Sequence, residues 1–128
     1  MPWKANITEP VPSSLVLAQN RISDLHPLAN LTRLTTLDLS TNPMSDLSPL
    51  AGLASLRALS VSYTQISDLS PLVSLSNLST LDLRHTGTRD LGALAGLGHL
   101  VTLNVSGNSL RDLAALAGLK LDRSGLLR

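Results

Sequence analysis

Apolar residues recur along this chain with one fixed period, and their pattern predicts most of the fold. Leucine occupies Leu31, Leu53, Leu75, Leu97 and Leu119, and each is 22 residues from the next. Nearly every other apolar residue falls into the same register, so seven apolar columns run through each complete unit. A unit of this length buries its apolar face only by stacking on its neighbours. The pattern therefore predicts a solenoid with one repeat in each coil.

Within each repeat, a short segment alternates apolar and other residues with period two. Successive side chains of a strand point to opposite faces, so the apolar ones should face inward and the intervening ones outward. More than a dozen residues separate one such segment from the next, which is typical of parallel strands. We therefore expect one parallel sheet with strands at 37–39, 59–61, 81–83 and 103–105.

The return path of each repeat carries signals of a short helical turn. Ser48 precedes Pro49 and Ser70 precedes Pro71, which predicts a capping hydroxyl followed by proline in the first turn. In the fourth and fifth repeats alanine replaces this proline, so aspartate should cap there and the turns should be more α-helical. We expect the turns to end in the left-handed conformation, at Asn30, Gly52, Ser74, Gly96 and Gly118.

Two polar columns are interpreted as structural. The first follows the strands, where a buried carboxamide can bind the turning backbone and where threonine makes fewer hydrogen bonds. The second consists of acids in equivalent turns, where a carboxylate can cap nearby amides without forming a metal site. The first column holds Asn20, Asn42, Thr64, Thr86 and Asn108, and the second holds Asp24, Asp46, Asp68, Asp90 and Asp112.

The repeat L31-T-R-L34-T-T-L37-D-L39-S-T-N42-P-M44 resembles the leucine-rich repeat family, whose pattern is LxxLxLxxNxL. It is most similar to the 22-residue class found in bacterial internalins and in a regulatory subunit of protein phosphatase 1. The resemblance covers about residues 15–119. It implies an α/β solenoid, a right-handed leucine-rich repeat coil with a parallel sheet on the concave face and short helical turns, 3-10 or α, on the convex face. It also implies a scaffold that binds proteins.

Composition narrows the picture to one domain of 128 residues with a core of nearly pure leucine, because the chain has no Cys or Phe and one Trp. The expected organisation is an extended flap at 1–14, the solenoid at 15–119, and a truncated last repeat or tail at 120–128. A net charge of +1 without a basic run does not favour nucleic acid as a partner. The N-terminus has no apolar segment that suits a signal peptide or membrane span, so we expect a cytoplasmic protein without a membrane partner.

The two ends raise the possibility of self-association. A solenoid exposes its apolar interior at both termini unless a distinct unit covers it, and no such unit is evident in the sequence. The chain could therefore dimerise through an open end. Alternatively, it could be a fragment of a larger leucine-rich repeat protein whose activity lies elsewhere.

Recognition should depend on the outward residues of the sheet, because a rigid curved surface presents them with little ordering cost. Most of these residues are small and hydroxylic. The large or charged ones are predicted to bind a partner protein, and they are Asp38, Tyr63, Asp82, Arg84 and His85. A simpler interpretation is that Asp82 and Arg84 form a solvated pair and that Tyr63 only stacks on His85.

Catalysis is not expected. A hydrolase-like enzyme could combine His85 with Asp82 and a serine such as Ser62 or Ser106, but an open wall of parallel strands offers no oxyanion site and does not exclude water. A zinc site at the three histidines is not expected either, because they belong to different faces. The sequence suggests no cofactor. One further departure, Thr88 in a column of larger apolar residues, marks the fourth repeat as the weakest coil.

Overall fold

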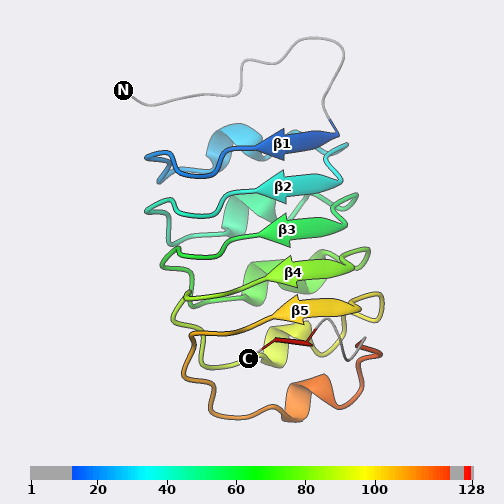
Figure 1. Ribbon diagram of the computed structural model, residues 1–128. Helices are drawn as coiled ribbons and strands as arrows, with labels where there is room; N and C mark the ends of the chain where they lie inside the picture. The colour runs from blue at the N-terminus through cyan, green and yellow to red at the C-terminus, as the bar shows by residue number, and fades with distance from the viewer. Residues whose placement is uncertain (1–12, 122–125, 128) are drawn as a thin grey trace.

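The computed structural model describes residues 13–121 and 126–127, and these form a right-handed solenoid (Figure 1). Six parallel strands pair in chain order, with one strand in each coil. The expected parallel sheet is thus confirmed, although each full strand begins one residue earlier than the alternation suggested. The strands are β1 (Ser14–Val16), β2 (Thr36–Asp38), β3 (Ala58–Ser60), β4 (Thr80–Asp82), β5 (Thr102–Asn104) and β6 (Leu126–Leu127).

The register of the sheet repeats the sequence period. Leu37 pairs with Leu59, and Leu59 pairs with Leu81, so residues 22 positions apart lie side by side. The last pairing differs, because Leu103 lies beside Leu126. These two residues are 23 positions apart, so the step from β5 to β6 is one residue longer than the step between the other strands. The flap expected at the N-terminus lies almost entirely outside the described residues.

Each coil crosses the convex side in a short 3-10 helix. These helices are η1 (His26–Leu28), η2 (Ser48–Leu50), η3 (Ser70–Ser74), η4 (Gly92–Leu94) and η5 (Ala114–Leu116). The expectation of more α-helical turns in the fourth and fifth repeats was wrong, since η4 and η5 span three residues each. Packing of the coil between its neighbours overrides the helix propensity of alanine here.

The caps of these helices also differ from the expectation. In the described part of the chain, no serine side chain caps one of these helices. Instead the Asp46 carboxylate accepts the backbone N–H of Ser48 at 2.9 Å and its hydroxyl at 2.7 Å. The aspartates of the other four coils accept the equivalent N–H at 2.8–3.0 Å. A carboxylate two residues before the turn is the stronger acceptor, so it replaces the serine oxygen.

Left-handed backbone occurs where the chain leaves the strands and not where the convex turns end. Gln19, Thr41, Tyr63 and His85 have φ between 52° and 59°, and Gly107 has φ of 76°. None of the residues expected to close the helical turns has a positive φ. The sharp reversal of direction is therefore made at the strand exits.

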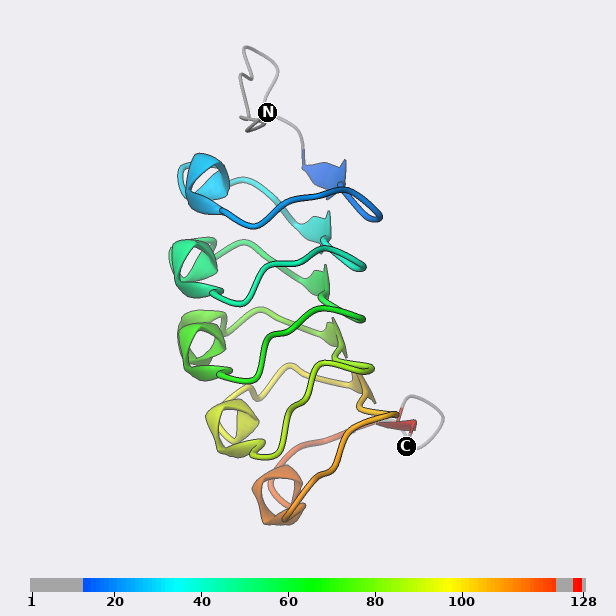
Figure 2. The same cartoon turned by 90° about the vertical axis from the view of Figure 1, so that its left-hand side faces the viewer.

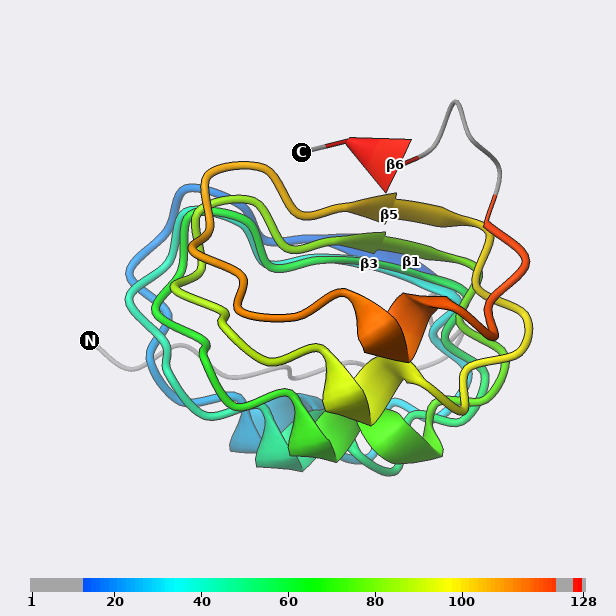
Figure 3. The same ribbon diagram turned by 90° about the horizontal axis from the view of Figure 1, so that it is seen from below.

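The strands form one column and the 3-10 helices form a second column beside it (Figure 2). The core lies between the two columns. Leucines of the central coils, such as Leu59 and Leu81, are no more than 2% exposed. Thr88, the residue expected to weaken the fourth repeat, is fully buried, and its hydroxyl lies 2.8 Å from that of Thr86. Seen along the axis, η5 lies closer to the sheet than the helices stacked before it (Figure 3).

Candidate functional site: the concave face and its borders

The asparagine column holds neighbouring coils together, as the sequence suggested. The Asn42 amide donates to carbonyls of its own coil and to Leu17 of the preceding coil at 3.0 Å, while its oxygen accepts the N–H groups of Asn20 and Ile22. Thr64 donates only to Val61 of its own coil. As expected, threonine in the central coils leaves this ladder with fewer bonds between coils.

The outward residues that end the strands, such as Asp38 in β2 and Asn104 in β5, have a structural role that sequence reasoning missed. Asp38 accepts the N–H and the hydroxyl of Ser40, at 3.0 and 2.7 Å. Asn104 does the same for Ser106, at 3.1 and 3.0 Å. Because the same acceptor two residues upstream recurs, Asp38 belongs to the strand-exit turn as well as to the outward surface. The spacing of Asp or Asn before Ser is the signal that could have revealed it.

Asp82 and Arg84 form a salt bridge on the fourth strand exit. Arg84 Nη2 lies 2.9 Å from Asp82 Oδ2, and Arg84 Nε lies 3.1 and 3.2 Å from the two carboxylate oxygens. The hydrogen bonds to Asp82 raise the pKa of the Arg84 guanidinium above its usual value. The Arg84 side chain is 41% exposed. Arg84 is therefore held in one orientation while its outer edge remains open to solvent.

Tyr63 and His85 stack along the solenoid axis. Their ring centroids are 4.7 Å apart and the ring planes differ by 15°. The Arg84 guanidinium carbon lies 6.0 Å from the Tyr63 centroid. On the other side, a Cβ at Gly107 would lie 2.4 Å from the His85 ring, so only glycine allows that ring to lie over the next coil. The structure thus brings Tyr63, Asp82, Arg84 and His85 together, and leaves Asp38 two strands away from Asp82.

An open hollow of about 460 Å³ borders this cluster. Tyr63, His85, Thr41 and Gln65 are among its lining residues. The described residues do not bring Asp82, His85 and Ser62 together as a hydrolase would need. Asp82 binds Arg84. Ser62 is 2% exposed, and its hydroxyl lies 3.4 Å from that of Ser60. Within the described residues no serine hydroxyl hydrogen-bonds a histidine ring. The hollow also opens to solvent, so it offers surface for contact and no enclosed reaction chamber.

The three histidines lie apart. His26 Nδ1 contacts Asp24 Oδ1 at 2.6 Å on the convex side, and His99 Nδ1 lies 3.0 Å from the Ser76 carbonyl oxygen before the fifth strand. Among residues 13–121 and 126–127, no three His, Cys, Asp or Glu side chains gather where a metal could bind. In the same ranges, no helix has the length and apolar character needed to span a membrane. The cytoplasmic location stays a prediction.

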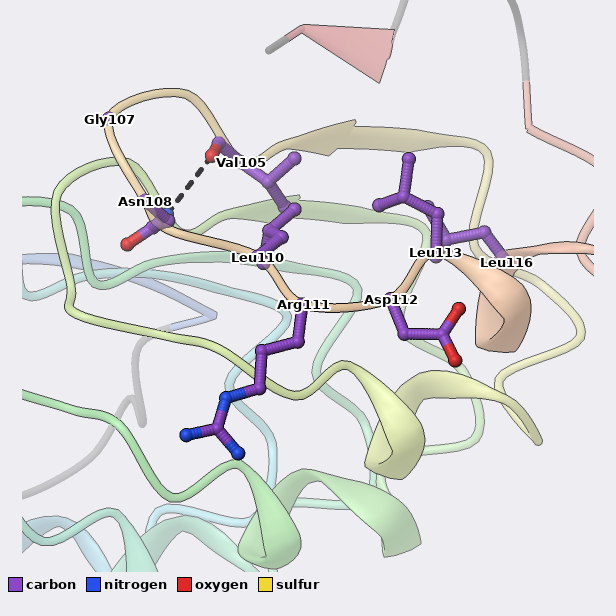
Figure 4. A pocket seen from close by; sticks show the side chains of 8 residues that line it. All are labelled: Val105, Gly107, Asn108, Leu110, Arg111, Asp112, Leu113 and Leu116. Carbon is purple, nitrogen blue, oxygen red and sulfur yellow. Dashed lines mark hydrogen bonds between the residues drawn. The ribbon is translucent and has the colours of Figure 1, made fainter.

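A second hollow, which sequence reasoning did not locate, lies at the C-terminal end of the solenoid. It measures about 420 Å³ and is lined by apolar and polar side chains between β5 and η5 (Figure 4). Figure 4 shows Leu110, Leu113 and Leu116 around it, with Arg111 and Asp112 at its border. The repeat pattern gave no signal for it, because the pattern assigns residues to columns and does not give their exposure.

The chain belongs to the leucine-rich repeat family. Residues 13–52 and 54–96 match the family described as Leucine Rich repeats (2 copies). No curated protein sequence matches the chain. Among solved structures, internalin C2 (inlC2) from Listeria monocytogenes is 37% identical with a TM-score of 0.75, over 83% of this chain and 48% of that one.

Two further structures from Listeria monocytogenes share the fold. The internalin inlF is 29% identical with a TM-score of 0.79, over 85% of this chain and 39% of that one. The functional domain of InlJ, which includes a cysteine ladder, is 24% identical with a TM-score of 0.75, over 85% of this chain and 24% of that one. The present chain thus spans about half or less of each structure, and it contains no cysteine.

Proposed function

We propose that this chain is a non-catalytic protein-interaction module that binds a partner protein on its concave face. The observation that carries the proposal is the cluster of Tyr63, Arg84 and His85 on an otherwise small and hydroxylic wall. Tyr63 is 52% exposed and Arg84 41% exposed. Tyrosine and arginine are enriched among the residues that dominate binding energy, whereas serine and threonine are not. The family and its internalin relatives support the same class of function.

The arrangement of the cluster favours binding because its side chains are already ordered. Asp82 fixes the Arg84 guanidinium through three hydrogen bonds, and His85 supports one face of the Tyr63 ring. A side chain held in position loses little entropy when a partner arrives. The simpler interpretation was that these residues only form a salt bridge and a stack. In this proposal, the same contacts hold Arg84 and Tyr63 in position for a partner. Asp38 lies at the border of the proposed surface.

The proposal is tested by finding a partner and then removing the cluster. Affinity purification with crosslinking from the native organism would supply candidates, and titration calorimetry would measure affinity. Tyr63→Ala combined with Arg84→Ala should weaken binding by about 2 kcal/mol or more, as truncation of dominant contacts does. The free energy of unfolding should change by less than about 0.5 kcal/mol, since both side chains lie on the outward surface of the sheet and not in the core.

The matched control lies on the convex side. Ser48→Ala combined with Ser70→Ala also removes two polar groups from one face, and it should leave the affinity nearly unchanged. If the ranking of the two double variants were reversed, the binding surface would lie on the convex face. If both bound as tightly as the original chain, the concave cluster would have no part in recognition.

A further inference from the structure

The stacked rings of Tyr63 and His85 belong to a column of residues at the strand exits. The column has one member in each coil: Gln19, Thr41, Tyr63, His85 and Gly107. The first four have φ between 52° and 59°, and Gly107 has φ of 76°, so each side chain leaves the backbone in a similar direction. Consecutive members therefore lie side by side along the solenoid axis, as the stacking of Tyr63 on His85 shows.

This stack is closed at one end and open at the other. A Cβ at Gly107 would collide with the His85 ring, so the backbone of the fifth coil already lies against that ring. At the other end, Tyr63 is 52% exposed although one face of its ring lies against His85. Much of this exposure therefore belongs to the opposite face, because the short side chain of Thr41 does not cover a phenol ring.

A hollow of about 460 Å³ lies at the open end of the stack. Thr41 and Pro43 of the second coil line one part of it, and Tyr63 and Gln65 of the third coil line another. Parallel strands lie about 4.8 Å apart. This spacing matches the 4.7 Å between the Tyr63 and His85 centroids. The place over Thr41 therefore has the depth of one more ring in the same stack.

We propose that this place over Thr41, the ring slot, receives one aromatic side chain of the partner protein, which stacks on Tyr63. The proposal rests on the function proposed above, and it specifies which kind of side chain the concave cluster binds. Aromatic rings favour offset stacking at centroid distances of about 4.5–7 Å, which the slot allows. An arginine side chain is also planar, but the Arg84 guanidinium lies 6.0 Å from the Tyr63 centroid and repels a second cation there.

Nuclear magnetic resonance on the full chain tests the slot with N-acetyltryptophanamide, which presents a single indole ring. A stacked indole should shift the signals of the Tyr63 ring protons and of the Thr41 methyl group, and the shifts should saturate. N-acetylleucinamide is the matched probe without a ring, and it should reach half of its own maximal shift only at a several-fold higher concentration. Equal midpoints for the two probes, or no shift with either, would overturn the proposal.

Filling the slot from within the chain is a sharper test. Thr41→Tyr adds a third ring to the column at a φ of 58°, and tyrosine already adopts a φ of 57° at Tyr63. The backbone N–H at this position can still donate to the Ser62 carbonyl, as it does at 2.9 Å. The variant should lose N-acetyltryptophanamide binding and should bind a partner of the concave face at least about tenfold more weakly. Retained binding of the probe would overturn the proposal.

Gln19→Tyr is the matched control. It adds the same ring to the same column at a φ of 59°, but one coil further from Tyr63, so the place over Thr41 stays empty. We expect this variant to bind N-acetyltryptophanamide at least as tightly as the original chain, and a loss equal to that of Thr41→Tyr would overturn the slot. If circular dichroism shows that Thr41→Tyr does not fold, Thr41→Phe fills the same place with a ring that lacks the hydroxyl.

The outcome for the slot can be separated from the outcome for the proposed function. A partner that requires Tyr63 and Arg84, but binds Thr41→Tyr unchanged, would support recognition by the concave face and overturn the slot. A partner that binds Thr41→Tyr and the double variant of Tyr63 and Arg84 as tightly as the original chain would overturn both.

Discussion

The first and last coils are built from the same repeat, yet they depend on different interactions. In the first coil the helical-turn leucines Leu25 and Leu28 are buried, while the equivalent Leu113 of the last coil is 44% exposed. Hydrogen bonding is distributed in the opposite way. The Asn108 oxygen accepts the N–H groups of Thr86, Gly87 and Thr88 in the preceding coil.

Asn20 of the first coil has a much smaller role. Its amide donates only to the Leu17 and Ala18 carbonyls of its own coil, at 2.8 and 3.2 Å. The side-chain oxygens of Asn42 and Asn108 accept N–H groups of the coil before their own, and within the described residues the Asn20 oxygen makes no such hydrogen bond. The ladder is therefore directional, because Asn42 and Asn108 each bind the coil before their own.

The largest effect should come from leucine positions that are equivalent in sequence and different in burial. Leu25→Ala should lower the free energy of unfolding by about 2–5 kcal/mol, because it leaves a cavity in packed surroundings. Leu113→Ala should cost about 1 kcal/mol or less, since its side chain is already partly in water. Urea titration of both variants measures the difference. Similar losses would mean that the two ends are equally packed.

The asparagine ladder should show the reverse order of the two ends. Asn108→Ala should cost about 1–3 kcal/mol, because it leaves backbone N–H groups of the fourth coil without their acceptor. Asn20→Ala should cost less than about 1 kcal/mol, since it removes hydrogen bonds that solvent can replace. The same urea titrations provide the comparison. A greater loss at Asn20 would contradict a ladder directed toward the N-terminus.

A smaller effect concerns pH and the caps of the first three convex turns. Hydrogen bonds from His26 lower the pKa of Asp24, those from Ser48 lower that of Asp46, and those from Ser70 lower that of Asp68. A carboxylate with a lowered pKa stabilises the fold at pH values above its ordinary value of 3.8, and this contribution is lost as pH falls through the folded-state pKa below 3.8. The stability of these coils should therefore decline in that acidic range.

Asp46→Asn separates titration from capping. Its side-chain oxygen can still accept the Ser48 N–H, but it does not change charge with pH. The variant should therefore lose less stability than the original chain between pH 4 and strongly acidic solution, as judged by thermal melting at each pH. Identical pH profiles would show that the Asp46 cap contributes nothing to acid sensitivity.

The repeat architecture followed from the sequence because residues 22 positions apart occupy equivalent places in successive coils. The leucine spacing predicted the parallel sheet, and the columns of Asn and Asp predicted the ladder and the caps. The local errors have a common cause. Ser48 was expected to cap a turn that Asp46 caps, since propensity cannot rank two acceptors that compete for the same N–H.

The residues of the candidate site could be predicted from the sequence, but the contacts between consecutive coils could not. Tyr63, Asp82, Arg84 and His85 were identified as large outward residues on neighbouring strands, and the pairing of Asp82 with Arg84 and the stacking of Tyr63 on His85 were foreseen as a simple interpretation. The support that Gly107 gives to the His85 ring was not foreseen. It depends on a backbone approach between consecutive coils, which residue types alone do not show.

The sequence by itself determined the period, the order of the strands, the inward columns and the outward grid, because a strict repeat places every residue in the register of its neighbours. Only the tertiary structure decided how far equivalent leucines are buried. Leu25 is 1% exposed and Leu113 is 44% exposed although they occupy the same position of the repeat, because burial depends on the packing around each coil. Stacking also placed the left-handed turns at the strand exits, where the backbone must reverse within the fixed spacing of the coils.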